Sequence, residues 1–271
     1  MKYHDKRFYF LIFFVALTIF SNPSLAGWNE ALSLYENKQY EESAKILSDL
    51  SNQGVTEAKI LLAALLFNGT GIKKDEASAV RLLEEAADEG NPDAMWRLGW
   101  LLLVQSELSK FTNDKSGLTL LEHAANNNVG DAQLMLGNIY REGKIVPRNY
   151  DLSVYWFDKA ANQNVVEAIH SLGVAYYNGW GVEVNYEKSV HFLSIASQGG
   201  FTRSTFNLAT MYRDGKGVTK DREKAKQLFL VAAKKGNINA MTQVSQDYFK
   251  GNGTERNIWE GTKWLYRSKT E

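Results

Sequence analysis

The chain has 271 residues, of which 44% are apolar and 23% are charged, as is usual for a folded protein and unusual for a disordered one. Lysine plus arginine and aspartate plus glutamate both number 31. The chain therefore lacks the overall positive field that draws proteins to phosphate backbones or anionic lipid, and no nucleic-acid partner is expected.

The first 26 residues have the three parts of a secretory signal peptide. Lys2, Lys6 and Arg7 form a basic start, and an apolar run follows from Phe8 to Phe20. The segment Ser24-Leu25-Ala26 then supplies the small residues that signal peptidase recognises. These features predict cleavage after Ala26 and export to the periplasm or the extracellular space.

The apolar run is too short for a permanent membrane anchor. It has 13 residues, whereas a helix needs roughly 20 to cross a bilayer. No later segment is apolar enough to span, so we expect no membrane span after cleavage. The chain also has no cysteine, which excludes disulfides, thiolate zinc sites and a cysteine nucleophile.

An internal period of about 36 residues organises the rest of the chain. Equivalent positions are separated by 36, 38, 36, 36 and 36 residues and are Ala58, Ala94, Ala132, Ala168, Ser204 and Ala240. An apolar residue stands four positions later each time, and a small residue follows it. A leucine or tyrosine stands eight positions after the start. Spacings of zero, four and eight lie on one face of a helix.

A turn and a second helix follow this first helix in each repeat. A Gly-x-Gly pair stands eleven and thirteen residues after the start in four repeats, where glycine suits a helix end because it accepts a positive φ. Good N-cap residues come next, at Asp75, Asn113, Asn149, Asn185, Asp221 and Asn257. Two of the turns contain an Asn-x-Thr triplet, beginning at Asn68 and Asn252, which we interpret as turn chemistry, although the triplet is also a glycosylation acceptor.

A helix pair of this kind cannot bury its apolar face alone and must stack on its neighbours. The predicted fold is therefore all-α, a right-handed superhelical solenoid of stacked helix-turn-helix repeats. The expected organisation is a signal peptide at 1–26, a capping helix pair at 27–56 and six repeats at 57–92, 93–130, 131–166, 167–202, 203–238 and 239–271.

The repeated residues resemble those of the Sel1-like repeat, a relative of the tetratricopeptide repeat. The run AIHSLGVAYYNGWGV from Ala168 to Val182 carries the resemblance most fully, and related runs recur from about residue 57 to the end. Two repeats depart from the pattern: the second lacks both turn glycines and is longer between Val104 and Asn113, and the third has Ile145 in place of the second glycine. The resemblance implies a scaffold or adaptor for other proteins, and for exported bacterial members a role with envelope, secretion or host-interaction components.

Nothing in the sequence forms a catalytic, cofactor or metal motif. After signal removal three histidines remain, His123, His170 and His191, without the i, i+4 spacing of a helical metal pair. The carboxylates of Glu84, Glu85 and neighbouring residues are expected on a solvated helix face. We therefore predict a non-enzymatic protein without cofactor or metal. A cell-wall or polysaccharide binding module and a hydrolase with a site in the groove are the alternatives.

The family resemblance implies that the first helix of each pair lines the concave, binding face. With the core at offsets zero, four and eight, offsets two, six and nine form the adjoining stripe. The candidate groove residues on this stripe are Trp96, Trp100, Asn138, Arg141, His170, Tyr177, Phe206 and Arg213. Aromatic residues and arginine dominate this set, and both are enriched at binding hot spots.

Overall fold

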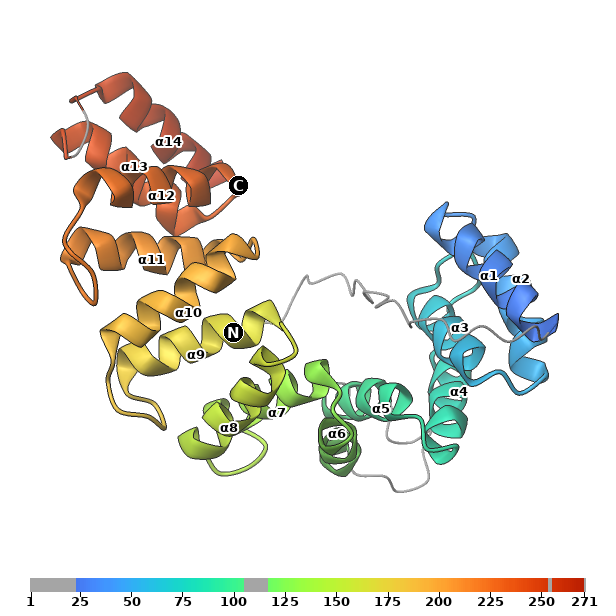
Figure 1. Ribbon diagram of the computed structural model, residues 1–271. Coiled ribbons are helices and arrows are strands. Elements are labelled where there is room, and N and C mark those ends of the chain that lie inside the picture. Colours follow the sequence, from blue (N-terminus) through green and yellow to red (C-terminus); the bar gives the residue numbers. More distant parts are fainter. Residues whose placement is uncertain (1–22, 105–116, 253–254, 271) are drawn as a thin grey trace. The chain divides into compact units, whose positions relative to one another are not determined.

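The computed structural model describes residues 23–104, 117–252 and 255–270, and within these ranges the chain forms fourteen helices and no strand (Figure 1). The predicted all-α repeat fold is confirmed. The helices, in chain order, are α1 (Pro23–Glu36), α2 (Tyr40–Asn52), α3 (Thr56–Asn68), α4 (Glu76–Asp88), α5 (Pro92–Val104), α6 (Gly117–Asn126), α7 (Gly130–Glu142), α8 (Tyr150–Ala161), α9 (Val166–Asn178), α10 (Tyr186–Gln198), α11 (Thr202–Asp214), α12 (Arg222–Lys234), α13 (Ile238–Lys250) and α14 (Ile258–Thr270).

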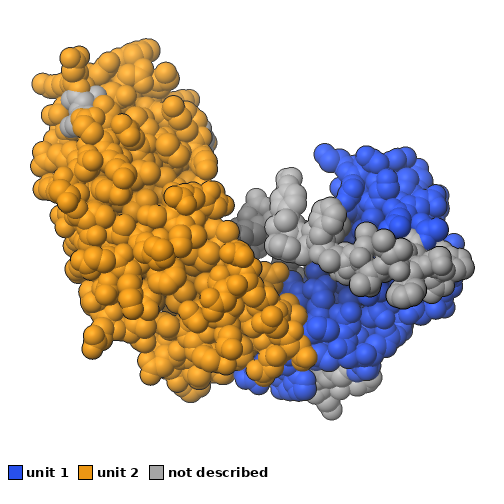
Figure 2. Space-filling view, viewed as in Figure 1, with its two compact units in different colours: residues 1–124 blue, residues 125–271 orange. Residues whose placement is uncertain are grey.

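The chain divides into two compact units, residues 1–124 and 125–271, which Figure 2 shows in different colours. From α1 to α5 in the first unit, and from α7 to α14 in the second, each helix packs against the helices that precede and follow it in the sequence. In the second unit, α7 to α14 form successive antiparallel pairs (Figure 1). None of the helices in the described ranges is long and apolar enough to cross a membrane.

Local chemistry sets the ends of the helices as the sequence predicts. The side chains of Asp75, Asn149, Asn185, Asp221 and Asn257 each accept a hydrogen bond from the backbone N–H three residues later. Asn113, the sixth predicted cap, lies outside the described residues. First helices end in a left-handed glycine, with φ between 67° and 74° at Gly69, Gly143, Gly179, Gly215 and Gly251.

The second turn glycine allows one repeat to pack closely against the preceding one. A Cβ at Gly181 would collide with the backbone of Tyr150 at the start of the preceding second helix. The ring of Trp180, next to this glycine, stacks on the ring of Tyr150 with centroids 5.5 Å apart. Ile145, in the third repeat, has no positive φ and is 49% exposed, so that turn differs from the others.

Each first helix crosses its second helix at a pair of small residues. Gly173 faces Ser189, whose hydroxyl donates to the Gly173 carbonyl at 2.7 Å. In the sixth repeat the serine lies on the first helix and the glycine on the second, and the Ser245 hydroxyl donates to the carbonyl of Gly261. The equivalent pairs in the other repeats are Ala63 and Ala79, Gly99 and Gly117, Gly137 and Ser153, and Ala209 and Ala225. Small side chains at both positions let the two helices approach closely.

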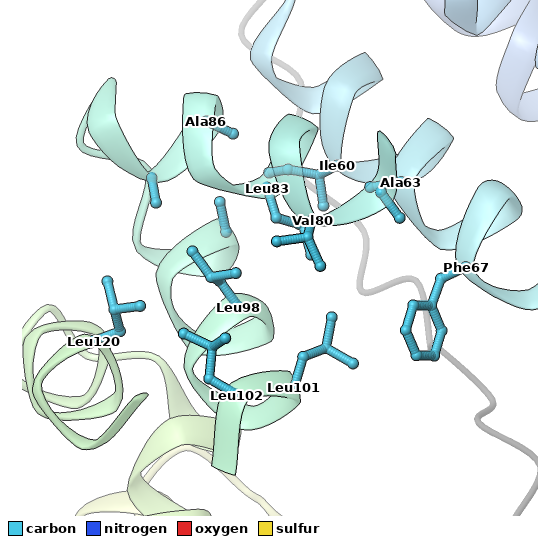
Figure 3. Packing of buried hydrophobic residues seen from close by; sticks show 13 residues of the cluster. Ile60, Ala63, Phe67, Val80, Leu83, Ala86, Leu98, Leu101, Leu102 and Leu120 are labelled. Atoms are coloured by element: carbon cyan, nitrogen blue, oxygen red, sulfur yellow. The ribbon is translucent and has the colours of Figure 1, made fainter. Parts of the chain in front are cut away.

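Aliphatic side chains between the helix pairs form the core. In the first unit, residues from α3, α4, α5 and α6 point toward one another (Figure 3), including Ile60, Leu83, Leu98 and Leu120. In the second unit, the same positions build further clusters around Phe157, Leu193 and Phe229. Trp156 and Trp264 occupy equivalent positions of the second helices α8 and α14, and both are buried.

One expectation about the acidic residues is wrong. Glu84 is 8% exposed, so it is buried in the first unit and does not lie on a solvated face. Close by, the buried Lys59 ammonium lies 3.1 Å from the Glu85 carboxylate and 2.7 Å from that of Glu89. The hydrogen bond to Glu89 raises the pKa of Lys59, so α3 and the end of α4 are joined by a charged contact that sequence periodicity did not reveal.

Candidate functional site

The first helices from α5 onward bury most of their surface but leave one stripe partly open, whereas the equivalent positions of α3 are buried at Ile60, Ala64 and Phe67. In α9, Ala168, Ser171 and Leu172 are buried, whereas His170, Val174 and Tyr177 remain half-buried. We call offsets two, six and nine of α5, α7, α9, α11 and α13 the first-helix stripe. All eight candidate groove residues lie on it, and all eight are half-buried.

The two tryptophans of the stripe belong to α5 in the first unit. The Trp96 Nε1–H donates to Asp93 Oδ1 at 2.7 Å, and the Arg97 guanidinium lies 5.5 Å from the Trp96 ring centroid. Trp100 packs against the cluster of Leu98 and Leu101. Both indoles therefore have a fixed place and still present part of their surface to solvent.

His170 joins two consecutive repeats in the second unit. Its Nδ1 forms a hydrogen bond with the Ser204 hydroxyl at 2.8 Å, and its ring centroid lies 4.8 Å from that of Phe201. Burial, together with the positive charges of Arg203 and Arg141, lowers the pKa of His170 to about 4. The imidazole is therefore neutral at neutral pH.

Tyr177 makes a second junction between the same repeats. The Lys216 ammonium donates to the Tyr177 hydroxyl at 2.7 Å and lies 4.7 Å from the ring centroid. It also lies 5.3 Å from the ring centroid of Tyr186. The hydrogen bond raises the pKa of Lys216, so its charge is retained at the surface of the stripe.

Arg213 reaches from α11 to α13. Its Nε and Nη2 donate to the two carboxylate oxygens of Asp214, and its Nη1 donates to Gln243 Oε1 at 3.1 Å. The hydrogen bonds to Asp214 raise the pKa of Arg213. Phe206, on the same helix, packs against Phe229 with ring centroids 5.5 Å apart.

The third repeat contributes Asn138 and Arg141 from α7. The Arg141 guanidinium lies 5.7 Å from the Phe157 ring centroid, and its Nη2 is 4.0 Å from a Glu142 carboxylate oxygen. The stripe of the second unit thus combines aromatic and charged groups, and His170, Tyr177 and Arg213 among them contact the next repeat. Such a surface can bind a polypeptide through stacking, salt bridges and hydrogen bonds. The serine that contacts His170, Ser204, is fully buried and does not face solvent.

The remaining histidines do not add a catalytic or metal site. His123 and His191 are exposed and lie on α6 and α10, and the His191 ring packs against Phe192. Among the described residues, no group of three or more His, Cys, Asp or Glu side chains is placed to hold a metal ion.

Sequence reasoning missed one site residue that breaks the repeat pattern. Asp247 stands seven positions after Ala240, where the other five repeats have the buried apolar residues Leu65, Leu101, Ile139, Ala175 and Met211. Aligning that seventh position would have revealed it. Its carboxylate accepts a hydrogen bond from Gln243 Nε2 at 3.0 Å, and burial raises its pKa.

The stacked helix pairs, the glycine turns and the small residues at each crossing define the class of α-helical solenoids that include the tetratricopeptide fold. The repeat itself identifies the family. The Sel1 repeat model matches residues 56–91, 92–129, 130–165, 166–201, 202–237 and 238–269, and the chain belongs to the Sel1 repeat family.

Two solved structures are similar over most of this chain. A Sel1 repeat protein from Oxalobacter formigenes is 26% identical, with a TM-score of 0.77, over 92% of this chain and 97% of its own. The c5321 protein of uropathogenic Escherichia coli, a protective antigen with the same repeat fold, is also 26% identical, with a TM-score of 0.78, over 92% of this chain and 54% of its own.

A more distant likeness concerns the fold alone. The immunity protein Pa5087 from Pseudomonas aeruginosa is 20% identical, with a TM-score of 0.53, over 80% of this chain and 84% of its own. No curated protein matches the chain. Sel1 repeat proteins generally mediate protein–protein interactions and are typically not catalytic.

Proposed function

We propose that this protein is an exported, non-enzymatic scaffold that binds a protein partner through the first-helix stripe. The observation that carries the proposal is the series of half-buried aromatic and arginine side chains on successive first helices, each held by a contact to its surroundings. Such residue types provide most of the binding energy in protein interfaces.

The contacts between repeats support this proposal energetically. His170, Tyr177 and Arg213 each form a hydrogen bond with a residue of the next repeat. A side chain that is already ordered loses less conformational entropy when a partner binds, about 0.5–1.5 kcal/mol for each side chain that would otherwise be immobilised. The stripe is therefore preorganised for binding.

The same contacts change the choice of test variants. Alanine at Trp100, Tyr177 or Arg213 would test the stripe only if the substitution left the stability of the fold unchanged. In the structure each of these side chains also holds part of the fold together. A variant that adds bulk to the stripe without removing such a contact is the sharper test.

Val174→Arg is expected to weaken partner capture at least about tenfold, because a long charged side chain at the centre of the stripe obstructs a partner and adds an uncompensated charge. Val174 is half-buried on α9. Ile195→Arg, on the second helix α10 where Ile195 is 39% exposed, is the matched control and should capture the partner normally. A pull-down from an envelope fraction with equal amounts of each folded variant measures the difference.

Equal capture by Val174→Arg and the wild type would assign the interface to another surface. Retention on glycan resin but no stoichiometric protein in the pull-down would favour the polysaccharide-binding alternative. Circular dichroism melting of both arginine variants verifies that the comparison is between folded proteins.

Export is part of the proposal and rests on the sequence of the first 26 residues, of which residues 1–22 lie outside the described ranges. Trp28 and Ala31, which pack into the core of the first unit, both follow Ala26 and would be kept after cleavage. One similar structure is that of a protein described as a protective antigen, which is in keeping with export.

The mature protein is expected to begin at Gly27, because Ser24 and Ala26 provide the small residues of a peptidase site. Intact-mass spectrometry of the periplasmic or secreted product measures the N-terminus directly. An Ala26→Asp variant, which removes the small residue at the cleavage site, should accumulate as the uncleaved precursor. A membrane-bound wild-type product that keeps the apolar run from Phe8 to Phe20 would contradict this prediction.

A further inference from the structure

A polar cavity of about 250 Å³ lies among α11, α12 and α13 in the second unit. Helix α12 contributes the most residues, and the first-helix stripe contributes Arg213. The cavity is lined by Arg213, Asp214, Lys220, Arg222, Ala225, Lys226, Phe229, Gln243, Asp247 and Asn252. At about 30 Å³ per molecule it has room for roughly eight waters, or for one polar side chain of a partner with several waters.

The cavity exists where the sixth repeat departs from the repeat pattern. The buried apolar residue at the equivalent position of the other repeats is replaced by Asp247, which is 9% exposed. A carboxylate in such a place is costly to the fold, and buried polar groups that break a local rule are concentrated at functional sites. Here the carboxylate makes one wall of the cavity polar.

A chain of hydrogen bonds fixes this wall. Arg213 donates to both carboxylate oxygens of Asp214 and to Gln243, and Gln243 in turn donates to Asp247. The Arg213 guanidinium also lies 5.9 Å from the Phe229 ring centroid. The cavity is therefore built from ordered polar groups over an aromatic floor.

The charges that line the cavity favour an anion. Four cations, Arg213, Lys220, Arg222 and Lys226, face two carboxylates. Asp214 is already paired with Arg213, and that pairing lowers the pKa of Asp214. Lys220, Arg222 and Lys226 then face one remaining carboxylate, that of Asp247, which leaves a surplus of two positive charges.

From this charge complementarity and from the position of the cavity beside the stripe, we propose that it receives an acidic side chain, glutamate or aspartate, from the polypeptide that binds the first-helix stripe. The inference rests on the proposed scaffold function and specifies the partner's chemistry, namely an acidic peptide segment. The arginine and lysine groups would pair with the entering carboxylate, and Gln243 and Asn252 could donate further hydrogen bonds.

The test measures the fluorescence anisotropy of a labelled oligoglutamate peptide with the purified protein, with an oligoglutamine peptide of equal length as the neutral comparison. The wild type is expected to bind the acidic peptide and not the neutral one. The double variant Arg222→Gln/Lys226→Gln should bind it about tenfold more weakly or worse, the change expected for losing about 1.4 kcal/mol.

The matched control is Lys234→Gln/Lys235→Gln, which removes the same charge from the end of α12 but outside the cavity. It should change peptide affinity by less than about threefold, since exposed charges beyond the site contribute little. Equal weakening in both double variants would mean diffuse attraction to α12 and would overturn the assignment.

Asp247→Asn, which keeps nearly the same side-chain shape, is expected to change peptide affinity in the opposite direction. Removing the carboxylate from the cavity should tighten binding of the acidic peptide several-fold, because it removes repulsion from the entering anion. Weaker binding in this variant, or preferential binding of an oligolysine peptide, would overturn the proposal. Inorganic phosphate that displaces the peptide at similar concentrations would show a general anion site instead of a peptide site and would also overturn it.

The outcome is separable from that of the scaffold proposal. If oligoglutamate fails to bind while Val174→Arg still abolishes partner capture, the cavity assignment is wrong and the stripe remains the interface. If oligoglutamate binds in the cavity and Val174→Arg has no effect on partner capture, the acidic site stands and the stripe assignment falls.

Discussion

Gly173→Leu is expected to destabilise the protein by about 1–3 kcal/mol, as overpacking of a closely fitted interior does. Even a Cβ at Gly173 would lie 2.8 Å from Leu193 Cγ and 3.2 Å from the Leu193 backbone nitrogen. The larger side chain would force α9 away from α10 and stretch the hydrogen bond between the Ser189 hydroxyl and the Gly173 carbonyl. Chemical denaturation followed by circular dichroism measures the change in the free energy of unfolding.

Asn178→Leu is the matched control for this substitution. Asn178 lies at the exposed end of the same helix, so the same side chain is introduced without crowding. Its effect should stay within about 0.5 kcal/mol. Two variants of equal stability would show that the crossing of α9 and α10 can widen at no cost, contrary to the tight packing described above.

Stability is expected to fall as the pH decreases from about 6.5 to about 4, through His170. The pKa of this histidine is about 4 in the folded protein and 6.5 in an unfolded chain. Below pH 6.5 the His170 side chain is therefore protonated in the unfolded chain but stays neutral in the folded protein. The contribution of His170 to stability is lost progressively until about pH 4. The shift corresponds to about 3 kcal/mol.

His170→Gln isolates this contribution, because glutamine offers Ser204 a hydrogen-bonding partner but does not titrate. The variant should be less stable than the wild type at pH 7, from lost packing against Phe201, but should lose less stability on acidification. The loss of stability is measured for both proteins from their denaturation midpoints at pH 7 and at pH 4.5. Titration of carboxylates affects both proteins equally, so the difference between them reports on His170. Parallel pH profiles would contradict a neutral, buried His170.

The amino-acid sequence by itself determined the helix pair and its repetition. The N-caps at Asn149 and Asn185 and the glycine turn at Gly179 depend on a few neighbouring residues, and their geometry follows from local backbone chemistry. The period of the apolar positions also predicted which offsets share a face of each first helix, because 3.6 residues per turn fixes them. These features needed no knowledge of how the repeats stack.

Only the tertiary structure decided which side chains meet across helices. The small residues of the first helices were visible in the sequence, but their partners, such as Ser189 opposite Gly173, lie 16 residues away on the second helix. His170 forms a hydrogen bond with Ser204, 34 residues later. The sequence predicts His170 in a groove, but in the fold it is partly buried, and burial keeps its imidazole neutral.

For the cavity proposed to bind an acidic peptide, too, the sequence reveals one feature and the tertiary structure the rest. Asp247 is detectable in the sequence as a carboxylate at an apolar position, but that pattern does not distinguish a packing defect from a site. Stacking of α11, α12 and α13 brings Arg213, Gln243 and Asp247 into one hydrogen-bonded wall. Such contacts depend on the rotation and translation between successive repeats, which the packing of the whole stack sets and no local sequence pattern encodes.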